Sequence, residues 1–397
     1  MMRKCFGWLM LLAAVAACGG QAAPPTVIIE MPTRVPTVAP AATLTTAPTM
    51  EPTAVPATEP PEGTGGGGEG AAVLLVDYKS DPPMIAIVDP ATGAEQGSFA
   101  APGLTELSSP RVGGPFMFYL DQSLQIVKRV GFDGSVTELR FITSGTDYFQ
   151  GDYLPSSDGT MIAWGTSVFD TSSGNDTHIT LNVANVDGSE PKAILDERLK
   201  DVSILPQPIQ WSPDGKFLYY TDEPYGIGGY ILFWGGPDLK RVDVQSGTIT
   251  EILPDTGCLC PMTVSPDGTT VAYIAGYGPL ELVLHDVATG DERRLSVDAG
   301  HLQAGDIVWS PDGKALVYTM AISNFENPES EKYAIVRVDA ATLSQTILIP
   351  DDQRLLQTAV WPTVNAVWLN DKDNNAWQMN PETGEVMLLE EGKRVVK

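Results

Sequence analysis

Histidine, cysteine and basic residues are all scarce in this chain of 397 residues. It holds three His, four Cys and 24 Lys and Arg against 50 Asp and Glu, so its formal net charge is −26. Nucleic acids and anionic lipid headgroups are bound by basic patches, so this balance argues against both and favours a basic partner or a cation. The sequence also lacks a Gly-x-Ser-x-Gly elbow and a His-Glu-x-x-His motif, and we predict no catalytic residues, no cofactor and no bound metal.

The apolar run at residues 6–17 is too short to span a membrane as a helix. It follows Arg3 and Lys4, as in a secretory signal peptide, and leads into Val-Ala-Ala-Cys-Gly, whose cysteine is Cys18. This ending resembles the lipobox of bacterial lipoproteins, and the resemblance implies cleavage before Cys18 and a lipid on its sulfur. The alternative is an ordinary secretory signal with a chance cysteine. We predict a signal peptide at 1–17 and a lipid anchor on the extracytoplasmic side of the cell membrane or outer envelope.

Residues 18–70 lack the apolar periodicity of a folded domain. Residues 22–62 contain 10 Pro and 9 Thr, and a glycine-rich run occupies 63–70. Proline holds a chain extended and removes backbone donors, while glycine disfavours helix. We therefore predict a disordered tether at 18–70 and one folded domain at 71–397.

Two cysteines, Cys258 and Cys260, remain once Cys5 leaves with the signal peptide and Cys18 is lipidated. A single intervening residue is too tight for a relaxed disulfide unless the backbone turns sharply, and a structural zinc site needs two more ligands. We expect two sulfurs that are either buried or bridged locally.

One hexapeptide recurs in the second half of the chain. Trp-Ser-Pro-Asp-Gly-Lys occupies residues 211–216 and 309–314, and Val-Ser-Pro-Asp-Gly-Thr occupies 264–269. Proline presets the first corner of a turn, aspartate bonds the nearby backbone and glycine accepts a positive φ, so each copy marks a turn between two strands. A short apolar run ending in an aromatic residue follows each copy and each degenerate copy. These closing residues are Tyr119, Trp164, Tyr220, Tyr273, Tyr318 and Trp368.

The runs are apolar on both faces, so each strand must be buried on both sides. Four short strands in every ~40–50 residues are typical of β-propeller blades, because a closed ring buries both faces of every blade. Residues 71–397 give about 47 residues per blade for seven blades and about 55 for six. We predict an all-β, seven-bladed propeller, with six or eight blades as alternatives. The first unit lacks its innermost strand, and we expect the tail at 393–397 to supply it and close the ring.

The repeats resemble the Pro-Asp relatives of the WD repeat, as found in the TolB propeller. The resemblance rests on the Trp-Ser-Pro-Asp-Gly-Lys turns and covers essentially all of 71–397. It implies the fold but little about function, because TolB-type proteins carry an extra N-terminal domain and usually six blades. Prolyl-oligopeptidase-type peptidases also carry such repeats but append an α/β-hydrolase domain, whereas we expect this chain to end with its last blade.

Three turns between the second and third strands of a blade are expected to be long, at about 165–178, 223–238 and 321–332. All three would lie on one face of the disc. Aromatic residues on glycine-rich loops over a rigid scaffold are typical of binding surfaces, although residues 230–234 alternatively extend a strand and pack into their blade. The predicted partner-binding residues are Tyr225, Tyr230, Phe233, Trp234 and Phe325. Acids of the other two loops would form the rim: Asp170, Asp176, Glu326, Glu329 and Glu331.

The sequence thus predicts a lipid-anchored, extracytoplasmic binding or scaffolding module of the cell envelope, without enzymatic activity. The predicted partner is an unknown envelope protein or small ligand, and we expect it to be basic or cationic. We expect a monomer that binds no nucleic acid and touches the membrane through its lipid anchor. The alternative is a propeller enzyme that acts on glycans or peptides through the central pocket, and convergent acids or histidines at the axis would favour it.

Overall fold

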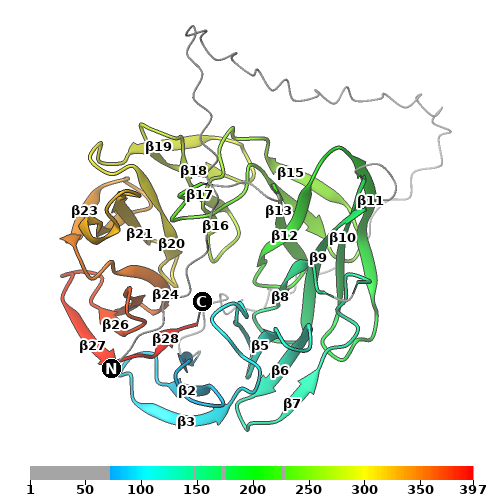
Figure 1. Cartoon of the computed structure of the whole chain (residues 1–397). Helices are drawn as coiled ribbons and strands as arrows, with labels where there is room; N and C mark the ends of the chain where they lie inside the picture. Colours follow the sequence, from blue (N-terminus) through cyan, green and yellow to red (C-terminus); the bar gives the residue numbers. More distant parts are fainter. Residues whose placement is uncertain (1–71, 147, 171–175, 225–228, 397) are drawn as a thin grey trace, which may run out of the picture. The chain divides into compact units, whose positions relative to one another are not determined.

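The computed structural model describes residues 72–146, 148–170, 176–224 and 229–396. These residues form seven four-stranded antiparallel sheets arranged as the blades of a ring (Figure 1). The predicted seven-bladed propeller is therefore confirmed. The predicted signal peptide, Cys18 and the tether lie outside the described residues. Within the described part there is one short 3-10 helix, η1 (Pro328–Ser330), and no helix that is long and apolar enough to cross a membrane.

Each blade holds four strands that run in order from the centre of the ring to its edge (Figure 1). The innermost strands, from the first blade to the seventh, are β28 (Arg394–Val395), β4 (Arg111–Gly113), β8 (Gly151–Pro155), β12 (Ile204–Trp211), β16 (Met262–Val264), β20 (Gln303–Trp309) and β24 (Gln357–Thr363). The second strands are β1 (Val73–Asp77), β5 (Phe116–Asp121), β9 (Met161–Asp170), β13 (Phe217–Pro224), β17 (Thr270–Ala275), β21 (Ala315–Ile322) and β25 (Ala366–Asn370). The third strands are β2 (Met84–Val88), β6 (Ile126–Gly131), β10 (Asp176–Asn185), β14 (Leu239–Asp243), β18 (Glu281–Asp286), β22 (Lys332–Asp339) and β26 (Ala376–Met379). The outermost strands are β3 (Glu95–Ala100), β7 (Val136–Glu138), β11 (Lys192–Lys200), β15 (Ile249–Leu253), β19 (Glu292–Ser296), β23 (Gln345–Asp352) and β27 (Val386–Glu390).

The chain's last strand completes the first blade, as predicted. β28 pairs antiparallel with β1, and Val395 lies opposite Leu75. The side-chain amide of Asn370, in the seventh blade, accepts a hydrogen bond from the Val395 N–H (2.8 Å) and donates one to the Val395 carbonyl (3.2 Å). The closing strand is therefore bonded to the two blades that it joins.

The hydrophobic core is divided among the seven interfaces between neighbouring blades, and one cluster of buried side chains fills each interface. At the interface that closes the ring, Val73 and Val395 of the first blade pack with Trp368 of the seventh. Alternate side chains of a second strand point to the two neighbouring blades, so both sets must be apolar. This burial on both sides explains the continuous apolar runs in the sequence.

The Ser-Pro-Asp-Gly turns join the innermost strand of a blade to the second. In the first intact copy, Ser212 Oγ accepts a hydrogen bond from the Phe217 N–H (2.9 Å) and so holds the two strands together. Gly215, Gly268 and Gly313 have φ values of +67°, +74° and +68°. These left-handed corners are the reason for the glycine in each copy, because a side chain would strain the backbone there.

Antiparallel alternation divides the loops between the two faces of the ring. The turns between second and third strands and the connections between blades share one face, which we call the loop face; the Ser-Pro-Asp-Gly turns lie on the opposite turn face. The three loops predicted to be long all belong to the loop face. β9 and β10 form a long hairpin, residues 225–238 join β13 to β14, and residues 323–331 join β21 to β22.

Candidate partner-binding face

Large apolar side chains are exposed mainly on the loop face. Those in its loops and at its strand ends are Leu107, Leu124, Tyr148, Phe169, Val202, Tyr230, Trp234, Tyr277, Leu302 and Phe325. The turn face exposes Val364, and the other exposed large apolar residues described lie in the outermost strands. Exposed apolar residues that gather on one surface, rather than being scattered, are typical of an interaction site.

The densest group lies over the fourth, fifth and sixth blades. Tyr230 and Phe325 make an edge-to-face pair with ring centroids 5.4 Å apart. Tyr230, Tyr277 and Leu302 border a cavity of about 170 Å³. The side chains of Tyr277, Phe325 and Leu302 are 77%, 74% and 62% exposed. We call these four residues the apolar cluster.

Polar contacts beneath the apolar cluster hold its central tyrosine in place. Tyr230 Oη donates a hydrogen bond to Glu331 Oε1 at 2.5 Å. This bond and burial raise the pKa of Tyr230 to about 12. The Gln303 side chain accepts a hydrogen bond from the Leu232 N–H (2.7 Å) and donates one to the Tyr230 carbonyl (3.0 Å). The loop of the fourth blade is thereby fixed to the sixth.

A disulfide lies under the same cluster. Cys258 and Cys260 are bridged, with Cα atoms 5.3 Å apart, and are 5% and 1% exposed. The Cys260 N–H donates to the Gly236 carbonyl (3.0 Å), and the Leu259 N–H donates to Tyr277 Oη (3.1 Å). The bridged segment therefore contacts two of the four loops that carry the cluster, those of Tyr230 and Tyr277. The two sulfurs, expected to be either buried or bridged locally, are both.

The structure brings two of the predicted partner-binding residues together, Tyr230 and Phe325. Phe233 is 5% exposed and packs against Tyr333 with ring centroids 5.9 Å apart, so in this conformation it supports the loop from below. Tyr225 lies outside the described residues. Residues 230–234 do not extend a strand, because β14 begins at Leu239.

Trp234 lies apart from the apolar cluster, although it is 39% exposed. It lines a separate cavity of about 210 Å³ together with Asp306 and Thr358. Its indole N–H donates a hydrogen bond to Glu223. Burial raises the pKa of the Glu223 carboxyl, against the effect of this hydrogen bond.

The structure exposes some of the acidic residues predicted to form the rim and buries one of them. Glu326 and Glu329 are exposed beside Phe325. Glu331 is 4% exposed, and its carboxylate is occupied by Tyr230 and by the Asn324 N–H at 3.0 Å. Placing Glu331 in the rim is therefore wrong, because its role is to hold the loop. Asp170 and Asp176 face each other across the β9–β10 hairpin.

Sequence reasoning misses Tyr277 and Leu302. The β17–β18 loop that carries Tyr277 is short, so its length gives no signal, but Tyr277 stands between Gly276 and Gly278. An aromatic residue flanked by glycines in a turn has few local packing partners, and this pattern was the available signal. Leu302 shows no such pattern, because its exposure is decided by the neighbouring blade.

Comparison with known proteins supports the repeat type and the fold. No family model matches the chain. A stretch of 108 residues, 27% of the chain, is 32% identical to the Tol-Pal system protein TolB of Alcanivorax borkumensis and spans 23% of that relative's length. Over this stretch the repeats are similar to those of TolB.

Two solved structures share the propeller fold. Oligogalacturonate lyase in complex with manganese has a TM-score of 0.51 and 15% identity, over 80% of this chain and 85% of its own. The oligogalacturonate lyase of Vibrio parahaemolyticus has a TM-score of 0.50 and 12% identity, over 81% and 86% of the two chains. Likeness at this level concerns the fold alone. In the part of this chain that the structure describes, no three His, Cys, Asp or Glu side chains are grouped so that they could hold a metal ion.

Proposed function

We propose that this protein is a lipid-anchored, extracytoplasmic propeller that binds a protein partner in the cell envelope through its loop face. The observation that carries the proposal is the exposure of large apolar side chains on that face, most densely in the apolar cluster over the fourth to sixth blades. Similarity to TolB, a protein of the Tol-Pal system, supports an envelope location and a protein partner. In this proposal residues 1–17 are the signal peptide, 18–70 the tether and 71–397 the propeller.

The charge around the apolar cluster favours a basic partner. Glu326 and Glu329 are exposed next to Phe325, and the whole chain has a net charge of −26. Large apolar residues at the centre of an interface supply most of its affinity, while charges at its rim raise the association rate. The partner would therefore present an apolar side chain surrounded by Lys or Arg, and the association rate would fall as salt is added.

Photo-cross-linking tests the proposed face. A photoreactive phenylalanine analogue at Tyr277 is expected to capture one partner reproducibly in native envelopes, since this side chain is 77% exposed within the cluster. The same analogue at Val364, which is 44% exposed on the turn face, is the matched control. Equal capture at both positions, or capture only at Val364, would contradict the proposed face.

The lipid anchor makes a separate prediction. Cys18→Ser removes the sulfur that would carry the lipid, so the mature protein is expected to leave the detergent phase for the aqueous phase in Triton X-114 partitioning. A single acyl group binds membranes weakly and several are needed for stable attachment, so loss of the whole anchor should release most of the protein. Cys5→Ser, inside the signal peptide, is the control and should leave the partitioning unchanged. If the Cys18→Ser variant partitions like the wild type, the lipid-anchor proposal is wrong.

An enzyme acting on glycans or peptides remains the alternative class. Its support is the fold shared with oligogalacturonate lyase, and a fold of this kind hosts many unrelated functions. The binding proposal is preferred because it rests on surface features of this chain.

A further inference from the structure

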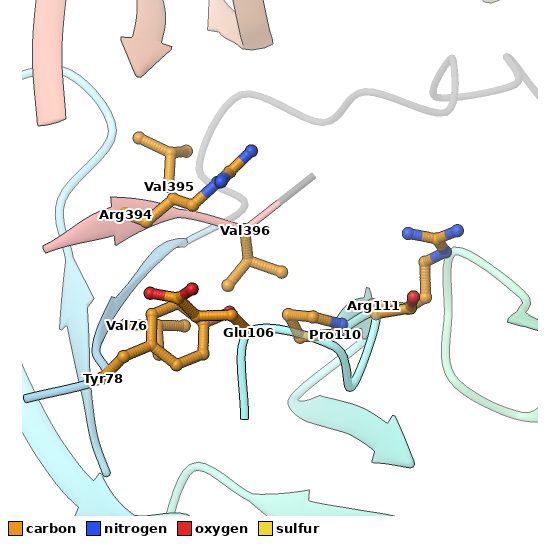
Figure 2. A pocket seen from close by; sticks show the side chains of 9 residues that line it. Val76, Tyr78, Glu106, Pro110, Arg111, Arg394, Val395 and Val396 are labelled. Carbon is orange, nitrogen blue, oxygen red and sulfur yellow. The ribbon is translucent and has the colours of Figure 1, made fainter. Parts of the chain in front are cut away.

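A third hollow opens on the loop face, at the inner edge of the first and second blades (Figure 2). Its volume is about 180 Å³, and its walls come from the end of β1, the connection between β3 and β4, and β28. Figure 2 shows the side chains of Arg394 and Arg111 on opposite sides of the view, with Val396 beside Arg394 and Pro110 toward Arg111. None of these residues belongs to the apolar cluster.

The two guanidinium groups are incompletely paired. Arg111 Nη2 lies 3.6 Å from Asp152 Oδ2, a long ion pair. Within the described residues Arg394 has no salt-bridge partner, and its one hydrogen bond is a long contact of 3.4 Å to the Asn374 side-chain oxygen. Glu106 lines the hollow but forms a salt bridge with neither arginine in the described part of the chain. Two guanidinium groups without a close carboxylate partner are notable in a chain with 24 basic and 50 acidic residues.

The floor of the hollow strengthens charge interactions above it. Val76, Val395 and Val396 line it and are 1%, 2% and 4% exposed. These buried side chains exclude water from one side of the hollow, so a charge–charge contact beside them is stronger than one surrounded by water. Tyr78 stands beside this floor; burial raises the pKa of its phenol, which Arg394 lowers and Glu106 raises. Both charged groups therefore act within the hollow.

The wall that carries Glu106 and Arg111 is rigid. Ser109 has a φ of +45°, a left-handed conformation that is strained for a residue with a side chain. The single hydroxyl hydrogen of Tyr153 is shared between the carbonyls of Ser109 (2.8 Å) and Ser108 (3.1 Å), and this three-centre hydrogen bond holds the segment in its shape. Strained backbone of this kind persists where its surroundings enforce it and is concentrated at binding sites.

From this geometry we propose that the hollow is a carboxylate-binding site, in which Arg111 and Arg394 grip a single carboxylate from two sides. The planar fork of a guanidinium group matches a carboxylate, and bonds of this type are charge-assisted. Glu106 disfavours ligands with two negative charges in one group, such as a phosphate dianion, and so selects a singly charged group. A volume of about 180 Å³ suits a small organic acid or the terminal residue of a peptide, and both present the same chemistry. The site shares no residue with the apolar cluster, so a test of the carboxylate site does not depend on the proposed partner face.

Titration calorimetry on the full chain tests the site with two pairs of probes. One pair is succinate and its uncharged diamide; the other is a short peptide with a free C-terminal carboxylate and the same peptide amidated. We expect the charged member of one pair to bind and its uncharged analogue to fail, and the pair that responds identifies the source of the carboxylate. No binding by either charged probe up to about 10 mM would overturn the proposal.

Three variants at the site and one control variant on the turn face separate this site from nonspecific attraction. Arg394→Gln and Arg111→Gln should each weaken binding about tenfold or more, since each removes a charge-assisted hydrogen-bond donor. Glu106→Gln should strengthen binding, an outcome that misfolding cannot produce. Lys314→Gln also removes one positive charge, but its exposed side chain lies on the turn face, so it should bind like the wild type. Unchanged binding by both arginine variants, or equal loss in the Lys314 variant, would show that the carboxylate is held elsewhere.

Discussion

Val395→Asp is expected to lower the free energy of unfolding by at least about 3 kcal/mol, because it places an unpaired carboxylate inside the closed ring. Val395 is 2% exposed and packs with Val73 and Trp368 at the interface between the first and seventh blades. It also belongs to the two-residue strand that completes the first blade. Urea denaturation gives the change in midpoint and slope.

The matched control is Val364→Asp, the same substitution at a side chain that is 44% exposed on a turn. A surface change of this kind should alter stability by no more than about 0.5 kcal/mol. Similar losses in the two variants would mean that the closing strand contributes little and that the ring is held by its other six interfaces. A reduced slope for Val395→Asp would indicate that the first blade opens before the rest unfolds.

Phe325→Ala is expected to weaken binding of the cross-linked partner by about 2 kcal/mol or more, while the melting temperature stays nearly unchanged. Its ring is 74% exposed and contacts Tyr230, so its removal uncovers part of the apolar cluster without leaving a cavity in the core. Affinity and melting are measured on the same preparation, by surface plasmon resonance and calorimetry. At high salt the affinities of wild type and variant should fall together, because Phe325 acts through apolar contact.

Phe233→Ala is the matched control from the same loop face, with the opposite expectation. Its ring is 5% exposed and packs with Tyr333, so truncation leaves a cavity and costs about 3 kcal/mol of stability. Binding by the fraction that remains folded should change less than in Phe325→Ala. If the two variants exchange these behaviours, Phe233 rather than Phe325 faces the partner and the loop conformation differs from the one described.

The repeats made the propeller predictable because their information is local. Pro, Asp and Gly at successive positions set the turn at Gly215, Gly268 and Gly313, and the apolar runs that follow need burial on both faces. The missing inner strand of the first unit and the β-prone tail together predicted the closure at Val395.

The candidate site was predictable only where one loop displayed its own signal. Aromatic residues among glycines pointed to the segment that contains Tyr230 and Phe233, but the pattern could not tell which ring faces outward. Tyr333 of the sixth blade packs against Phe233 and keeps that ring buried. The hydrogen bond from Tyr230 to Glu331 fixes the position of the Tyr230 ring. Exposure depends on neighbours that are distant in sequence, so composition alone cannot assign it.

The sequence by itself determined the repeat unit and the way the ring closes, and it favoured seven blades over six or eight. The reasons are the turn chemistry and strands that must be buried on both sides. Tertiary structure alone decided which residues share a surface. Arg111 and Arg394 come from nearly opposite ends of the propeller and line one hollow only because the last strand completes the first blade. Closing a ring joins segments that have no local interaction, and no periodic pattern in the sequence records which side chains then lie together.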